Sequence, residues 1–164
     1  MKAINDARRQ LKRERALGAG YLRSQLESAG EKEYCVASVF EHQVNVRWRD
    51  TDALGHVNNA VYLTYLEEAR DAFYLRALGD PIYVVVRLEI DFRAEVRHTD
   101  RSVSVEIAVE RLGTTSLTTS ETIRTAAGEL AAEARVITVR WNQDQRAVVP
   151  FGEDERARLA EFAL

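Results

Sequence analysis

Residues 47–70, RWRDTDALGHVNNAVYLTYLEEAR, join a polar loop to an amphipathic segment. Two aspartates, a glycine, a histidine and two asparagines come first, and apolar residues spaced three and four apart follow. That spacing is typical of one helix face, here Tyr62, Tyr65, Leu66, Ala69, Ala72 and Phe73. We therefore expect a helix over 59–78, ended by Gly79 and Pro81.

Alternating apolar and polar residues predict strands on both sides of this helix. Before it, the alternation comprises His42, Val44, Val46 and Trp48. After it, we expect strands over 86–96, 103–109, 115–124 and 130–141. In the first of these, the predicted core face carries Val86, Leu88, Ile90, Phe92, Ala94 and Val96. The short turns between strands indicate an antiparallel meander.

A strand, a long helix and four further strands predict a two-layer α+β domain. The length of 164 residues suits one such domain, which we place at 41–150. A helical tail over 151–164 follows, with its helix at 153–162. Residues 1–40 form a predicted basic helical extension, because the first twenty-five residues hold seven Lys or Arg and only two acidic residues. Contact with RNA or a membrane surface is one interpretation, and a solvated or self-packing extension is the one we favour.

Composition argues against several classes of function. A net charge of −3 creates no field that recruits nucleic acid or an anionic membrane, and no apolar run reaches the about 18 residues of a spanning helix. The single cysteine, Cys35, fits an inert thiol in a reducing compartment, so we expect a cytoplasmic location. No Cys and His occur at metal-ligand spacing, so we expect no metal. Trp48, Trp141 and the helix tyrosines are assigned to the core rather than to a stacking platform.

The loop before the helix gathers several kinds of chemistry. Asp50 is expected to cap the helix or order the loop, and this explanation is weaker for Asp52. Gly55 permits a positive φ or a close approach by another group. His56 is a base, a ligand or a packed loop residue. Glu67 and Glu68, further along, are expected on a solvated helix face, where one of them pairs with Arg70.

The start of the helix supplies hydrogen-bond donors. Asn58 and Asn59 are typical N-cap residues, and the unpaired N–H groups of the first turn can bind an anion or a developing oxyanion. A carboxylate facing such a turn suits attack on a carbonyl, as nucleophile or as base for water.

With these residues, the stretch resembles the signature of hotdog-fold acyl-CoA thioesterases of the 4-hydroxybenzoyl-CoA thioesterase type, in which an antiparallel sheet wraps one long helix. The resemblance covers about residues 41–141. It implies that Asp52 is the catalytic carboxylate and that the Asn59 N–H polarises the thioester carbonyl. Ser116 matches a position near the CoA phosphates, with Gly113, Thr114 and Thr115 in place of the family's basic residues.

The run His56-Val57-Asn58-Asn59 also resembles plant-type acyl-carrier-protein thioesterases, where the histidine is catalytic. Those proteins have an asparagine where this chain has Leu54, so we rank His56 below Asp52, as a positioning or structural residue. Gly55 and Asn58 are assigned to substrate binding.

The resemblance implies hydrolysis of an acyl-CoA or acyl-carrier-protein thioester by a homodimer or homotetramer, without a cofactor, since CoA belongs to the substrate. A non-catalytic acyl-CoA sensor is the alternative. A hotdog dehydratase is a weaker one, because its histidine lies in a loop that is not found in this sequence.

Overall fold

The computed structural model describes residues 38–164, and all structural statements concern this part of the chain. Its elements, with η for 3-10 helices, are β1 (Phe40–Asn45), η1 (Trp48–Asp50), α2 (Asn59–Leu78), β2 (Tyr83–Phe92), η2 (His98–Asp100), β3 (Ser102–Leu112), β4 (Ser116–Thr125), β5 (Leu130–Asn142), β6 (Ala147–Val148) and α3 (Glu153–Ala160). Cys35 and nearly all of the predicted basic extension lie outside the described residues.

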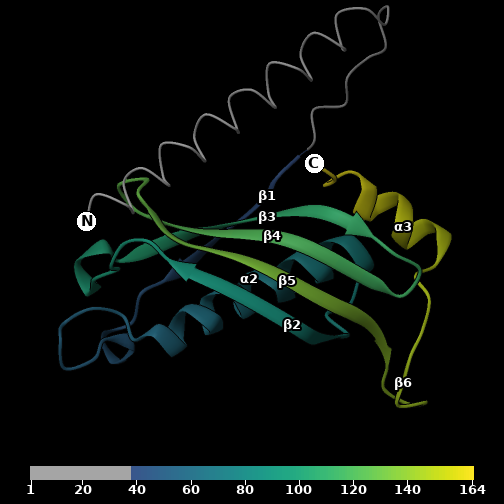
Figure 1. The fold of residues 1–164 in the computed structure, drawn as a ribbon, viewed down its shortest axis with the longest axis horizontal. Helices are drawn as coiled ribbons and strands as arrows, with labels where there is room; N and C mark the ends of the chain where they lie inside the picture. The colour runs from purple at the N-terminus through teal and green to yellow at the C-terminus, as the bar shows by residue number, and fades with distance from the viewer. Residues whose placement is uncertain (1–37) are drawn as a thin grey trace, which may run out of the picture. The chain divides into compact units, whose positions relative to one another are not determined.

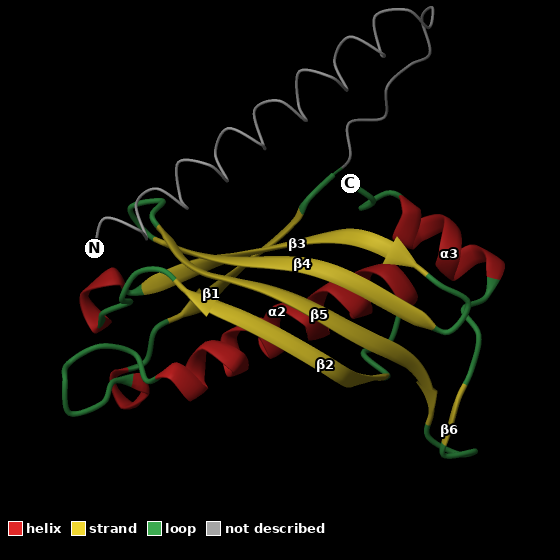
Figure 2. Cartoon of the chain, viewed as in Figure 1, coloured by secondary structure: helices red, strands yellow, loops and turns green. Residues whose placement is uncertain are grey.

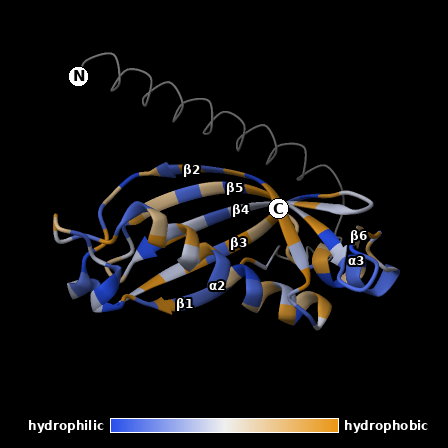
Figure 3. Ribbon diagram, turned by 90° about the horizontal axis from the view of Figure 1, so that it is seen from below, coloured by the Kyte–Doolittle hydropathy of each residue, from blue (hydrophilic) through white to orange (hydrophobic). Residues whose placement is uncertain are grey.

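Strands β1 to β5 form one antiparallel sheet in the order β1-β3-β4-β5-β2, and the short β6 pairs with β5. The helix α2 lies against one face of this sheet (Figures 1 and 2). Figure 3 shows β1 and β2 at the opposite edges. The predicted α+β architecture of a long helix and about five strands is confirmed, and the helix has the predicted bounds. The predicted meander holds for β3, β4 and β5 but is wrong for β2, which pairs with β5 instead of β3. The reason is that residues 93–101, which include η2, join β2 to β3 in place of a short turn.

The core lies between α2 and the inner face of the sheet. Strand β3 alternates as predicted, and Val103, Val105, Ile107 and Val109 are all buried. From α2 the buried residues include Tyr62, Tyr65, Leu66, Ala69, Phe73 and Tyr74. Because burial of apolar area is the main favourable term in folding, this face fixes how α2 sits on the sheet.

The prediction that the first strand reaches Trp48, with Trp48 in the core, is wrong. β1 ends at Asn45, and Trp48 begins η1 with 79% of its surface exposed. The alternation stops because the Asp50 carboxylate accepts a hydrogen bond from the Arg47 N–H at 2.8 Å and turns the chain. Trp141 is half-buried near the end of β5.

The prediction for the second strand is also partly wrong. β2 ends at Phe92, so Ala94 and Val96 lie beyond it, and a register shift between Val85 and Arg87 leaves Val86 exposed. Only Leu88 and Ile90 of the core face predicted within this strand are half-buried, while Phe92 is exposed. The cause is that β2 is an edge strand, with no neighbour on its outer side among the residues that the structure describes.

Arg70 does not form the predicted pair with a glutamate of its own helix. Its Nη1 donates to the Glu121 carboxylate of β4 at 2.7 Å, and both side chains are buried. Thr119 donates a second hydrogen bond to Glu121. Burial raises the pKa of Glu121, and the Arg70 charge opposes this shift. Glu68 instead accepts a 2.7 Å hydrogen bond from Arg47.

The C-terminal segment packs on the same core. The helix α3 is two residues shorter than predicted, and Leu159 and Phe162 are buried. The Phe162 ring contacts the rings of Phe40 and Phe73, and Ala163 bridges to Val109. No helix among residues 38–164 is both long and apolar enough to cross a membrane.

Candidate active site

Asp50 orders the loop that precedes α2. Its buried carboxylate accepts hydrogen bonds from the Arg47 N–H at 2.8 Å and from the Tyr65 hydroxyl at 2.7 Å, and its carbonyl accepts from the Asn58 N–H. Burial, with the Asp50 carboxylate next in importance, raises the pKa of the Tyr65 hydroxyl. Asp50 therefore has the loop-ordering role expected from the sequence.

Asp52 lies in a tight turn. Its carboxylate accepts a 2.8 Å hydrogen bond from the Leu54 N–H, and its carbonyl accepts one from the Gly55 N–H. The turn is closed by a 2.9 Å hydrogen bond from the Asp52 N–H to the His56 carbonyl. Gly55 has φ of 84°, and a β-carbon there would meet no atom within 4 Å. The glycine therefore serves the backbone conformation, the first of its two expected roles.

The first turn of α2 leaves one N–H free. The Asn58 side chain caps the helix by accepting from the Ala60 N–H at 2.9 Å, and the Asn58 carbonyl accepts from the Val61 N–H. Among residues 38–164, the Asn59 N–H has no hydrogen-bond partner. Because a helix N-terminus carries partial positive charge, this N–H is a donor ready for an oxygen that gains negative charge.

A pocket of about 280 Å³ is lined in part by Asn59, the residue that carries this N–H. Its lining residues are His56, Val57, Asn59, Tyr62, Phe92, Arg93, Ala94 and Glu95. The pocket therefore joins the polar loop, the first turn of α2 and the end of β2, which are distant in sequence. Asp52 lies next to it, with its Oδ1 3.7 Å from the His56 Nδ1.

Of the eight residues that line this pocket, sequence reasoning assigns only His56 and Asn59 to the site. It places Tyr62, Phe92 and Ala94 on core faces, and it does not single out Arg93 or Glu95. The one sequence feature that marks these residues is the end of the apolar alternation near Val96. That feature does not show that the chain after β2 folds back beside the polar loop.

Ser116 lies far from these groups within one chain. β4 starts at Ser116, and its other end pairs with the start of β5, where Ala132 faces Phe92 of β2. Ten residues at about 3.3 Å each separate Ser116 from the pocket end of the sheet by roughly 30 Å. The structure therefore brings Asp52, Gly55, His56, Asn58 and Asn59 together and leaves Ser116 apart.

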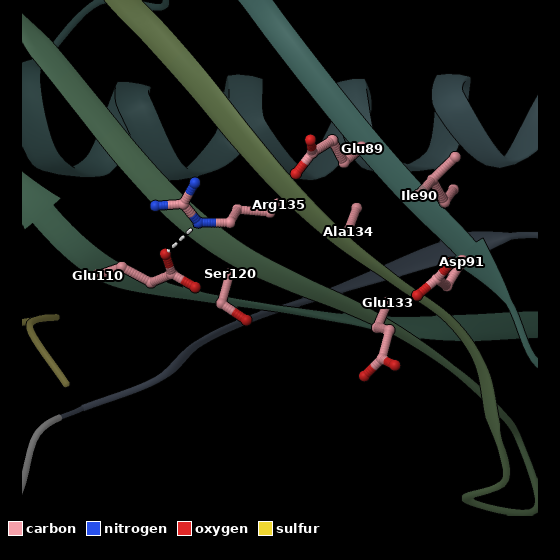
Figure 4. A pocket seen from close by; sticks show the side chains of 8 residues that line it. All are labelled: Glu89, Ile90, Asp91, Glu110, Ser120, Glu133, Ala134 and Arg135. Carbon is pink, nitrogen blue, oxygen red and sulfur yellow. Dashed lines mark hydrogen bonds and ion pairs between the residues drawn. The ribbon is translucent and has the colours of Figure 1, made fainter. Parts of the chain in front are cut away.

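A larger hollow of about 370 Å³ lies on the outer face of the sheet (Figure 4). Four carboxylates and Arg135 line it, and the Arg135 Nε donates to Glu110 at 2.7 Å. It contains neither the carboxylate of the loop nor a free helix N–H. The smaller pocket has the chemistry of a reaction site, so we take it as the candidate active site.

The arrangement can hold a carbonyl oxygen at the Asn59 N–H with the Asp52 carboxylate nearby. These are the oxyanion donor and the base or nucleophile that acyl transfer needs. Within residues 38–164, no group of three or more His, Cys, Asp or Glu side chains is placed to hold a metal ion.

Comparison with known proteins agrees with this chemistry. Residues 46–159 match the family model of the thioesterase-like superfamily. The uncharacterized protein YsmA of Bacillus subtilis is 23% identical over 133 residues, which cover 78% of this chain and 90% of YsmA.

Similar solved structures include two named as thioesterases. A predicted thioesterase from Bacillus stearothermophilus is 27% identical with a TM-score of 0.70, covering 77% of this chain and 98% of its own. A thioesterase from Thermus thermophilus, complexed with coenzyme A and Zn, is 34% identical with a TM-score of 0.66. The match covers 73% of this chain and 95% of the Thermus thermophilus chain. The family match, the hotdog architecture and the pocket lead to one conclusion: this chain belongs to the thioesterase-like superfamily and is a thioester hydrolase.

Proposed function

We propose that the enzyme hydrolyses acyl-CoA thioesters, with Asp52 as the reacting carboxylate and the Asn59 N–H as the oxyanion donor. The observation that carries this proposal is that the Asn59 N–H has no partner among residues 38–164, while Asn59 lines a pocket next to Asp52. Binding of coenzyme A by the Thermus thermophilus relative favours CoA over an acyl carrier protein as the carrier.

In the reaction, the thioester carbonyl oxygen accepts a hydrogen bond from the Asn59 N–H. As base, Asp52 removes a proton from water while the water oxygen bonds to the carbonyl carbon. As nucleophile, its carboxylate oxygen forms that bond and water hydrolyses the resulting anhydride. In both routes the C–S bond breaks with its electron pair on sulfur, which takes a proton. No cofactor is needed, because CoA is part of the substrate.

Asn59→Pro tests the oxyanion donor. Proline is tolerated at the first helical position, and the ψ of 139° at Asn58 suits a residue before proline. The variant therefore loses the N–H while the helix start remains. We expect kcat to fall about 10² to 10³-fold with an acyl-CoA panel and free-thiol detection. Asn59→Ala, which keeps the N–H, is the matched control, and full activity of Asn59→Pro would show that this N–H is not the donor.

Asp52→Asn tests the carboxylate. We expect at least about a 10²-fold loss of kcat, while Asp144→Asn, an exposed aspartate in the turn after β5, keeps wild-type activity. A single turnover in ¹⁸O-water distinguishes the routes, because only the nucleophilic one places label in the Asp52 carboxylate. Retention of full activity by Asp52→Asn would exclude both.

We also propose that two copies pair through β2. Within the described part of the chain, this strand has an unpaired outer edge, and it exposes Val84, Val85, Val86 and Phe92. A long apolar edge strand is a template for pairing with another chain. Antiparallel pairing of two β2 strands about a two-fold axis would bring the Ser116 end of one copy toward the pocket of the other. A contact between Ser116 and CoA is therefore proposed across the dimer.

For the cell, we propose a cytoplasmic location. The sequence has one cysteine and so cannot form a disulfide within the chain. That composition agrees with a reducing compartment.

A further inference from the structure

The loop after β2 is tied to the polar loop. The Val57 N–H donates to the Val96 carbonyl at 2.8 Å, and His56 forms an antiparallel bridge with Arg97. These contacts lay residues 93–97 beside the turn that holds Asp52.

Tyr62 fastens the same loop to the first turns of α2. Its hydroxyl accepts from the Val96 N–H at 3.0 Å and donates to the Ala94 carbonyl at 3.2 Å. Glu95, between these two residues, is therefore held at the pocket wall although its side chain is half exposed.

His56 lies between two carboxylates. Its Nδ1 is 3.7 Å from the Asp52 Oδ1, and its Nε2 is 3.9 Å from the Glu95 Oε2. Each separation needs to shorten by about 1 Å to become a hydrogen bond. Contacts of this kind are often long in unliganded enzymes and tighten around the substrate. Arg97 pairs with Glu95, and Arg93, which also lines the pocket, is paired with Asp91 and Glu133.

We propose that Glu95 is a positioning residue that acts through His56, and this proposal rests on the proposed hydrolysis. Glu95 accepts the Nε2 proton of the imidazole, so the Nδ1 lone pair faces Asp52. When Asp52 acts as base, the proton that it takes from water passes to Nδ1. The imidazolium beside Glu95 then protonates the departing sulfur, so the proton removed from water ends on the thiol.

The kinetic test compares Glu95→Gln, Glu95→Asp and His56→Gln in the full chain. We expect Glu95→Gln to lower kcat about tenfold or more with KM within about twofold, and Glu95→Asp, which restores the charge, to recover part of the loss. In the His56→Gln background, Glu95→Gln should cause no further loss, because both residues act as one unit. Glu106→Gln, which changes a partly exposed, arginine-paired glutamate on the outer sheet face, is the matched control and should keep full activity.

Equal losses from Glu95→Gln with and without His56 would overturn the proposal, and so would an unchanged kcat. Unfolding curves for every variant separate these effects from loss of the fold. If Asp52→Asn is inactive in the same assay while the two losses add, the role of Glu95 fails and the proposed hydrolysis stands.

A spectroscopic test does not depend on turnover. ¹H–¹⁵N correlation of the imidazole nitrogens reports which nitrogen carries the proton, and His56→Gln identifies the signal among the three histidines. We expect the Nε2–H form in the wild type and a change toward the Nδ1–H form in Glu95→Ala. An unchanged ratio of the two forms would contradict the proposal even if no acyl-CoA were turned over.

Discussion

The Tyr65 hydroxyl donates a 2.7 Å hydrogen bond to the Asp50 carboxylate and so joins the second turn of α2 to the polar loop. The other aspartate of the motif, Asp52, lies beside the pocket, and its hydrogen bonds to residues 38–164 all fall within its own turn. The two carboxylates, two residues apart, therefore have different tasks. One holds the loop on the helix, and the other is available for chemistry.

Tyr65→Phe should lower the free energy of unfolding by about 1–3 kcal/mol, because the buried Asp50 carboxylate loses a donor that water cannot replace. Urea titration measures this loss. Asp52→Asn should change the same quantity by less than about 0.5 kcal/mol, because its amide oxygen still accepts from the Leu54 N–H. Equal losses in the two variants would contradict this division of roles.

Asn58→Ala should cost about 1 kcal/mol of stability, because the Ala60 N–H loses its cap. Asn58→Asp keeps an acceptor at the cap and is the matched control. We also expect kcat to fall in Asn58→Ala, since a frayed first turn no longer aims the Asn59 N–H. Unfolding curves and thiol-release assays on the same samples check both effects, and a fully active Asn58→Ala of wild-type stability would show that the cap does not position the donor.

Glu121→Leu should lower the free energy of unfolding by about 3–5 kcal/mol, because it leaves the Arg70 guanidinium buried without its partner. The double variant Arg70→Met/Glu121→Leu should lose much less, since apolar groups of similar size then fill the space. A double-mutant cycle of urea unfolding energies measures the difference. A double variant as unstable as the sum of the two single losses would contradict this expectation.

The free energy of unfolding should fall in alkali because of three buried tyrosines and one half-buried tyrosine. Burial is the main cause that raises the pKa of Tyr62, Tyr65, Tyr74 and Tyr83 above the ordinary value near 10. In alkali the native state therefore keeps tyrosine protons that the unfolded chain releases. The contribution of these tyrosines to the free energy of unfolding is complete below about pH 10 and is lost as pH rises toward the native pKa.

Unfolding free energies between pH 9 and 11 test this dependence. Tyr74→Phe should show a shallower decline than the wild type, by up to about 1.4 kcal/mol per pH unit above 10. The slope is the diagnostic quantity, because the lost hydrogen bond between Tyr74 and Thr138 shifts the whole curve instead. Identical slopes would mean that Tyr74 titrates equally in both states.

Val86→Lys should break the proposed dimer, because a charge on the free edge of β2 opposes strand pairing. Sedimentation analysis should give a dimer for the wild type and a monomer for the variant, with loss of acyl-CoA turnover. Val148→Lys changes a similarly exposed valine on β6 and is the control. A wild type that is active as a monomer would contradict pairing through β2.

Local periodicity made much of the fold predictable. The apolar positions of α2 and the cap and stop residues around it were enough to predict Asn59–Leu78, because these signals act within a few residues. The alternation of apolar and polar residues wrongly predicts strands that reach Trp48 and Val96. The turn that Asp50 holds stops the first strand early, and the edge strand β2 ends at Phe92 although the alternation continues. The Arg70–Glu121 pair joins residues 51 apart, and no local pattern relates them.

By itself, the sequence determined the helix, the succession of strands along the chain and the chemical types gathered at 50–59, because propensity, capping and alternation are local properties. Only the tertiary structure decided that β2 pairs with β5 and that Asp50 is bonded to Tyr65. It also decided that the Asn59 N–H remains free within residues 38–164, and that Glu95 reaches His56 from a loop 39 residues later. These relationships depend on how α2 and the end of β2 pack against each other. Packing joins side chains through space, which spacing along the chain does not record.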